Sequence, residues 1–182
     1  MSSFPIFLRI DAGTWSRVGA ATLPNRTLTV AAAFALASWN RFGAQGFFEP
    51  RAILRMLLTG VWGWLALSLV LWVIARRVDE ELRSDPVTSM QRMAASVTVA
   101  HFPLIILGFY IATFGAFIRT PVPGTILAVA VFAVWIPRLL VRAFQHVAEV
   151  DVRTAAGAIV IPYLLWLAII GRWLFIQVGH LL

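Results

Sequence analysis

Three histidines have the broadest chemical repertoire in this sequence, because imidazole can bind metals and exchange protons near neutral pH. None of them, His101, His146 or His180, has a second histidine at i+4 or a nearby pair of carboxylates. The chain has no cysteine, which excludes disulfides, thiol nucleophiles and thiolate ligands. It also lacks a glycine-rich phosphate loop and a nucleophile beside a base. The sequence therefore predicts no metal centre, no resident cofactor and no enzyme.

His101 lies inside a long apolar run, two residues before Pro103. A polar ring at membrane depth must find a partner, and we expect a hydrogen bond to a neighbouring helix. The alternative is axial ligation of a haem or chlorophyll-type ring, which needs one imidazole and an apolar slot. His101 is therefore the candidate cofactor ligand if the chain binds a pigment.

A second group of polar residues recurs at helical spacing: Arg138, Arg142, Gln145 and Glu149, with His146 alongside. Residues three and four apart share one face of a helix. This face is a candidate contact surface for a soluble partner or for anionic lipid. The alternative is a solvated helix end balanced by its own ion pairs. The acidic run at residues 79–81, beside three arginines, is interpreted as charge pairing within a loop.

Small residues form a ridge within the apolar run at residues 93–117, at Gly108, Ala112 and Ala116. This spacing lets another helix approach closely, from this chain or from a partner. Prolines lie within three of the apolar runs, at Pro103, Pro137 and Pro162. Each removes one backbone donor and permits a kink where a neighbouring group satisfies the freed carbonyl.

These side chains must be positioned by membrane-embedded helices. Of 182 residues, 60% are hydrophobic and 13% are charged, a composition that leaves too little polar surface for a soluble domain. Lipid cannot satisfy backbone groups, so continuous apolar runs must be helical. The net charge of +7 comes from arginines scattered between apolar segments, which favours membrane headgroups over nucleic acid as the anionic partner.

The pattern predicts an all-α bundle of about five transmembrane spans. Four spans are clear, at residues 52–74, 93–117, 125–141 and 154–177. The first apolar segment, residues 28–38, is too short to cross and needs residues 39–48 to do so. Residues 1–26 are expected to lie in the membrane interface as an amphipathic segment, and residues 27–182 to form the membrane domain. Asp85 before Pro86, and Asp151, are expected to cap helices.

The arginines favour one orientation. If residues 28–48 cross and the N-terminus is cytoplasmic, ten arginines lie inside and five lie outside. If that segment does not cross, the count becomes eight against seven, which expresses no preference. We therefore expect five spans in the cytoplasmic (inner) membrane, with the N-terminus inside.

Four short motifs follow one another along nearly the whole chain. They are residues 14–18 (Thr-Trp-Ser-Arg-Val), residues 100–103 (Ala-His-Phe-Pro), Trp135 leading to residues 142–144 (Arg-Ala-Phe), and residues 153–155 (Arg-Thr-Ala). In order and spacing they resemble the bacterial branch of the Yip family, small polytopic membrane proteins named for interaction with Ypt/Rab GTPases. The resemblance implies a five-helix membrane fold with a cytoplasmic N-terminus and no catalytic residues. The long soluble N-terminal region of the eukaryotic members, which act in vesicle trafficking, has no counterpart in this sequence.

The expected function is that of a non-enzymatic, Yip-like membrane scaffold or adaptor, with membrane lipids and other membrane protein subunits as partners. One alternative is an accessory subunit of a larger electron-transfer or photosynthetic complex, with His101 as a tetrapyrrole ligand. A third hypothesis, suggested by the prolines, is a small-molecule carrier.

Overall fold

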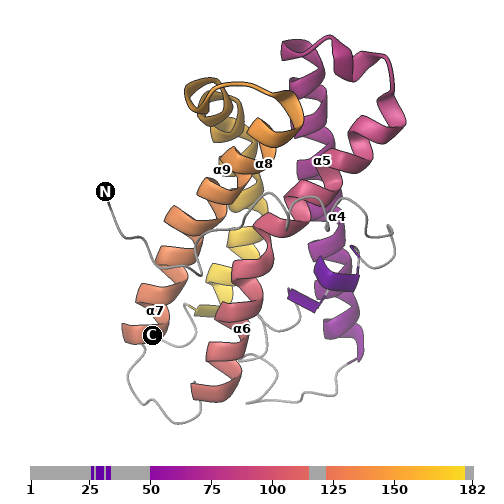
Figure 1. The fold of residues 1–182 in the computed structure, drawn as a ribbon. Helices are drawn as coiled ribbons and strands as arrows, with labels where there is room; N and C mark the ends of the chain where they lie inside the picture. The colour runs from indigo at the N-terminus through magenta and orange to yellow at the C-terminus, as the bar shows by residue number, and fades with distance from the viewer. Residues whose placement is uncertain (1–25, 27, 31, 34–49, 115–121, 179–182) are drawn as a thin grey trace.

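The computed structural model describes residues 26, 28–30, 32–33, 50–114 and 122–178, and within these ranges it contains helices and no strand. The elements can be followed in Figure 1 in the order α4 (Pro50–Val78), the 3₁₀ turn η2 (Glu81–Arg83), α5 (Pro86–Ala100), α6 (Phe102–Phe114), α7 (Val122–Val129), the π-helical turn η3 (Ala130–Trp135), α8 (Ile136–Ala148) and α9 (Val152–Val178). The all-α prediction is confirmed for this part of the chain.

Four helical stretches are long and apolar enough to cross a membrane: Leu58–Val78, Pro86–Tyr110, Ile126–Ala148 and Val152–Ile170. They overlap the four clear spans of the sequence, so the prediction of several helices that are long and apolar enough to cross a membrane is confirmed. The number of spans and the orientation stay predictions. The predicted crossing at residues 28–48 and the interfacial segment at residues 1–26 lie largely outside the described residues. Within them, Arg26 is buried and donates from Nη1 to the carbonyl oxygen of Gln91 at 3.0 Å.

Local sequence signals set where the helices begin and end. The carboxylate of Asp85 accepts a hydrogen bond from the backbone N–H of Thr88 at 3.1 Å, and Pro86 takes the first helical position of α5. The carboxylate of Asp151 accepts from the backbone N–H of Arg153 at 3.0 Å and from the hydroxyl of Thr154, before α9. Both predicted caps are confirmed.

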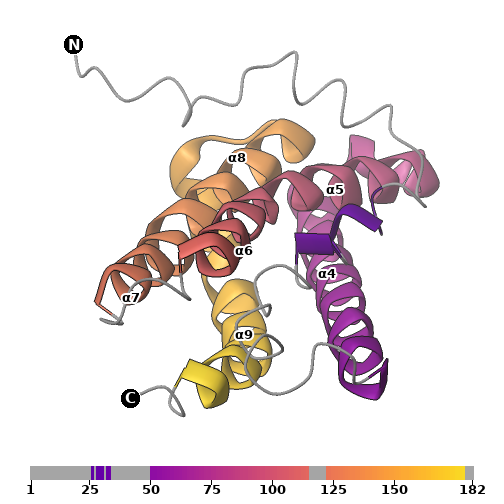
Figure 2. The ribbon, with the colours of Figure 1, turned by 90° about the horizontal axis from the view of Figure 1, so that it is seen from below.

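The helices form a four-cornered bundle. α5 packs against α4 and α8, and α9 packs against the same two helices. Viewed from below, α5–α6 and α7–α8 lie side by side in one layer, and α4 and α9 lie beneath them (Figure 2). The α4–α5 and α8–α9 connections lie at one end of the bundle, at the top of Figure 1. We call this the connection end.

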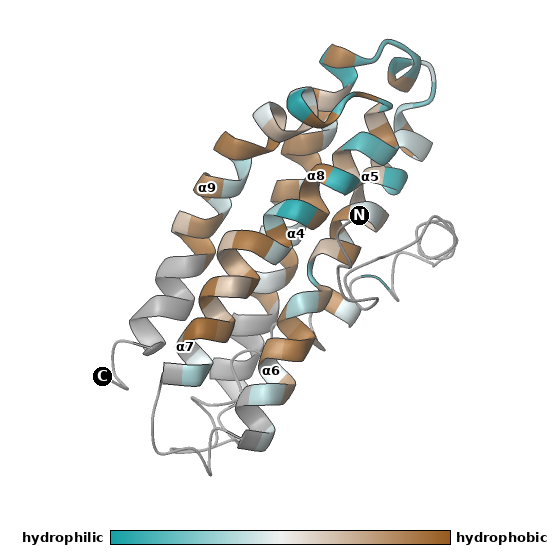
Figure 3. Ribbon diagram, turned by 60° about the vertical axis from the view of Figure 1, so that its left-hand side comes forward, coloured by the Kyte–Doolittle hydropathy of each residue, from teal (hydrophilic) through white to brown (hydrophobic). Residues whose placement is uncertain are grey.

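The core lies between the two layers, where Trp64, Leu71, Met93, Leu140 and Phe144 are fully buried. α5 is the innermost helix, because every residue from 93 to 100 is buried. The outward faces of α4 and α9 remain apolar, and hydrophilic residues gather toward the connection end (Figure 3). Apolar outward faces are what lipid contact requires.

Candidate functional site

His101 lies at the junction between α5 and α6 and is 1% exposed. Its backbone N–H turns back to the carbonyl oxygen of Thr98 at 3.0 Å, so the carbonyl of Val97 loses the partner that a regular α-helix would give it. The imidazole replaces that partner, with Nδ1 at 2.8 Å from Val97 O. A carbonyl oxygen can only accept, so this pairing requires the hydrogen on Nδ1.

This hydrogen bond stays within α5, whereas we expected one to a neighbouring helix. The contact that joins the α5–α6 junction to α9 is aromatic. The rings of His101 and Trp166 meet edge to face, with centroids 5.5 Å apart and planes at 87°. Tyr163, one turn earlier on α9, stacks on Trp166 with centroids 5.8 Å apart and planes at 21°. These three rings form a buried group that we call the aromatic core cluster.

Tyr163 links the aromatic core cluster to the Ile126–Ala148 stretch. Its hydroxyl donates to the carbonyl oxygen of Phe132 in the π-helical turn. In this turn the N–H of Ile136 bonds to the carbonyl of Val131, five residues back. The same register would pair Phe132 O with the nitrogen of Pro137, which has no hydrogen. Tyr163 therefore satisfies a carbonyl that Pro137 leaves without a backbone donor, as expected of an intramembrane proline.

Other polar side chains inside the bundle also bond to main-chain carbonyls. The indole of Trp64 donates to Ala94 O at 3.2 Å, and the hydroxyl of Thr98 donates to the same oxygen at 2.8 Å. Ser68 donates to Trp64 O at 2.7 Å. These contacts match the need to satisfy polar groups in hydrocarbon. Their geometry serves packing, and none of them pairs a nucleophile with a base.

A tetrapyrrole on His101 would have to approach the remaining ring nitrogen, Nε2, with the face of a macrocycle. Because the imidazole is 1% exposed among closely packed helices, such a ligand requires the helices around it to separate. No group of three or more potential metal-binding side chains occurs in the described ranges. The surroundings of His101 therefore fit a packed histidine better than an axial ligand.

The predicted polar face of α8 forms. Arg138, Arg142, His146 and Glu149 are exposed, and Gln145 is half-buried with Nε2 at 3.5 Å from Val150 O. The opposite face of the helix is buried in the bundle: Ile136, Leu139, Leu140, Ala143, Phe144, Val147 and Ala148. Glu149 ends the helix in the left-handed conformation, at φ 48°, which is uncommon for a residue with a side chain.

The small-residue ridge is described in part. Gly108 is buried in α6. The side chain of Ala112 and the whole of Ala116 lie outside the described residues, so the close approach predicted for this ridge stays a prediction.

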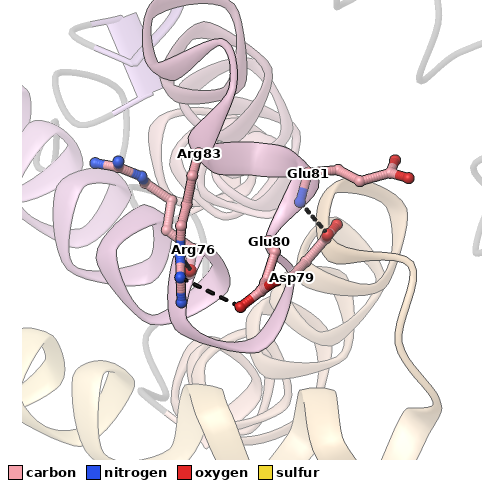
Figure 4. A network of polar contacts seen from close by, with 5 residues as sticks. All are labelled: Arg76, Asp79, Glu80, Glu81 and Arg83. Atoms are coloured by element: carbon pink, nitrogen blue, oxygen red, sulfur yellow. Dashed lines mark hydrogen bonds and ion pairs between the residues drawn. The ribbon is translucent and has the colours of Figure 1, made fainter.

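The acidic loop pairs as predicted, although weakly. Nη1 of Arg83 lies 3.4 Å from Oε1 of Glu80, and Nε of Arg83 donates to Arg76 O at 2.8 Å. The backbone N–H of Glu81 donates to Asp79 Oδ1 at 2.9 Å, and the side chain of Glu81 points away from the others (Figure 4). The guanidinium of Arg76 also lies over the ring of Trp72, 4.7 Å from its centroid.

Tyr163 and Trp166 were not among the candidate residues chosen from the sequence. The available signal was a tyrosine inside an apolar run, because a buried phenol needs an acceptor.

No protein-family model, no curated protein and no solved structure matches this chain.

Proposed function

We propose that this chain is a non-enzymatic, Yip-like integral membrane scaffold or adaptor that organises other membrane proteins. The main support is how its interior polar groups are used. Trp64, Ser68, Thr98, His101 and Tyr163 all bond to main-chain carbonyls. The interior is thus built for packing, and the surface carries the features that another molecule can recognise.

The charged surface is concentrated at the connection end. All six acidic residues within the described ranges lie there: Asp79, Glu80, Glu81, Asp85, Glu149 and Asp151. Seven arginines lie in the same region, in the last turns of α4, in η2, in the first turns of α5, on α8 and at the start of α9. A dense mixture of both signs favours specific contacts with a soluble domain or loop of a partner.

The same arginines support the orientation. Of the eleven described arginines, seven lie toward the connection end and three, Arg51, Arg55 and Arg172, toward the other. The eleventh, Arg26, bonds to the carbonyl oxygen of Gln91 in α5. An excess of arginine is typical of the cytoplasmic side. The connection end therefore faces the cytoplasm in this proposal, and residues 28–48 supply a fifth span of the inner membrane, which leaves the N-terminus inside.

The test is purification from native membranes in mild detergent, comparing the wild type with an Arg77→Glu, Glu81→Arg double variant. This swap keeps the net charge and changes two exposed side chains at the connection end. A partner should co-purify in fixed proportion with the wild type, and the amount of co-purified partner should decrease with the double variant. An Arg55→Glu variant at the opposite end serves as control and should retain the partner.

Two results would overturn the proposal. One is hydrolysis or transport of a small substrate by the purified chain without partners. The other is a tetrapyrrole absorption band that His101→Leu abolishes, which would identify a pigment-binding subunit.

A further inference from the structure

One continuous exposed stripe runs along the third crossing. It consists of residues three to five apart on the outward side: Ile126, Val129, Val134, Arg138 and Arg142. The three apolar members are 64%, 54% and 62% exposed. The stripe changes from apolar to basic once, between Val134 and Arg138. The half-buried Trp135 lies at this step, where amphipathic rings favour the headgroup level.

The dimensions of the stripe match one leaflet of a bilayer. Twelve residues separate Ile126 from Arg138, which corresponds to about 18 Å of helix axis. Half of a hydrocarbon core measures about 15 Å. An acyl chain of one leaflet that begins at a phosphate beside Arg138 can therefore run along the helix as far as Ile126. Arg142 follows one turn later on the same face, close enough for both guanidinium groups to reach one anion.

We propose that this stripe binds one anionic phospholipid, with its phosphate held by Arg138 and Arg142 and an acyl chain along Val134, Val129 and Ile126. Each guanidinium has five donors in a planar fork that matches phosphate oxygens. A hydrogen bond or ion pair of Arg138 within the chain therefore still leaves N–H donors for the lipid phosphate. The site does not depend on the scaffold role, because it needs no protein partner.

The apolar part of the stripe favours a lipid over an acidic protein. A glutamate-rich segment would complement the arginines, but it would leave the exposed valines and isoleucine uncovered. A phospholipid complements both parts, since it joins an anion to a hydrocarbon chain. α4 provides a natural comparison, because its apolar outward face ends at a single exposed arginine, Arg77, after Val73. Because the stripe ends in two arginines on α8, we expect it to prefer an anionic headgroup more strongly than the outward face of α4 does.

The test uses the full chain in vesicles of equal phosphatidylglycerol and phosphatidylcholine, followed by mild solubilisation and native mass spectrometry of the retained lipid. The wild type should retain phosphatidylglycerol in excess of its share. The Arg138→Gln, Arg142→Gln variant should lower that excess about tenfold. Arg77→Gln should leave it nearly unchanged. Equal thermal midpoints in detergent would establish that the variants remain folded.

A charge-preserving variant separates headgroup binding from folding. Arg138→Lys, Arg142→Lys keeps the charge and should retain a reduced excess, because lysine lacks the bidentate fork. Retention of both lipids in their bulk ratio by the wild type would overturn the proposal. An equal loss with Arg77→Gln would overturn it too, because the effect would then be one of general charge. Binding of a glutamate-rich peptide without lipid preference would assign the stripe to a protein and reject the lipid.

Discussion

The hydroxyl of Tyr163 donates to Phe132 O, a carbonyl that has no backbone donor because residue 137 is a proline. We expect Tyr163→Phe to lower the free energy of unfolding by about 1–3 kcal/mol, since it leaves Phe132 O buried without that donor. In a Pro137→Ala background the backbone regains an N–H, so the same substitution should cost less. Unfolding in mixed micelles, carried out on all four combinations, measures this coupling.

The matched control is Tyr110→Phe, on α6, which also removes a phenolic hydroxyl but leaves the hydrogen bond from Tyr163 to Phe132 O in place. Equal costs of Tyr163→Phe in both backgrounds would show that the hydroxyl and the proline act independently. Tyr163 would then not be the donor that replaces the N–H missing at Pro137.

Gly63 lies where α4 and α9 approach each other closely. A Cβ at this position would lie 2.7 Å from Cδ1 of Ile170 and 3.3 Å from Nε1 of Trp166, whereas a Cβ at Gly157 would meet nothing within 4 Å. Gly63→Ala and Gly157→Ala share the same gain in helix propensity. Their difference in unfolding free energy therefore isolates the overpacking, and should be about 1–3 kcal/mol.

The measurement is the same unfolding assay, with Gly157→Ala as the internal reference. Similar stabilities of the two variants would mean that Ile170 moves aside at no cost, and that α4 and α9 are packed less closely than the distances indicate.

At the scale of the helix, the first turns of α5 and α9 depend on ionised carboxylates. Hydrogen bonds from Thr88 hold the pKa of Asp85 below its ordinary value, and those from Thr154 and Arg153 do the same for Asp151. A carboxylate whose pKa is lower in the folded state stabilises the protein at pH values above its unfolded pKa, about 3.9. That contribution is lost as the pH falls through the folded pKa.

The Asp85→Asn, Asp151→Asn variant should therefore lose less stability than the wild type between pH 6 and pH 3, because asparagine caps a helix without titrating. Thermal midpoints measured across this range provide the test. Parallel curves for the two proteins would show that these two caps do not set the acid sensitivity.

The elements differ in how far the sequence could predict them. The start of α5 was predictable because Asp85 and Pro86 act on their own helix. The polar face of α8 was predictable because its spacing is local. The break at His101 and the π-helical turn were not, since the 93–117 and 125–141 runs looked continuous. Their geometry depends on which distant side chain reaches the freed carbonyl, and Tyr163 lies 31 residues from Phe132.

The same division applies to the whole molecule. The four helices that are long enough to cross a membrane follow from apolar length, a property of each segment by itself. Which helices become neighbours follows from packing between segments, as where Trp64 of α4 reaches Ala94 O of α5. A hydropathy pattern contains no information on such pairs. The orientation is only partly a local property, because the arginine count on each side depends on whether residues 28–48 cross the membrane.

The absence of cysteine makes the orientation directly measurable, because each introduced cysteine is the single thiol of the chain. We expect a membrane-impermeant maleimide added to intact cells to label Thr113→Cys, near the end of α6, and to leave Glu81→Cys unlabelled. Both side chains are exposed, and the Pro86–Tyr110 crossing lies between them. Inside-out vesicles should give the reverse pattern, and labelling of both positions from one side would refute the crossing.

Ser3→Cys extends the experiment to the number of spans. If residues 28–48 cross, the N-terminus lies on the same side as Glu81 and should be protected in intact cells. If they do not cross, two spans, Leu58–Val78 and Pro86–Tyr110, separate Ser3 from Thr113. Both positions then lie on the same side, so Ser3→Cys labels together with Thr113→Cys. The ten-to-five arginine count requires the first result. Labelling of Ser3→Cys from outside would reduce the bundle to the four crossings already described and remove the basis for a cytoplasmic N-terminus.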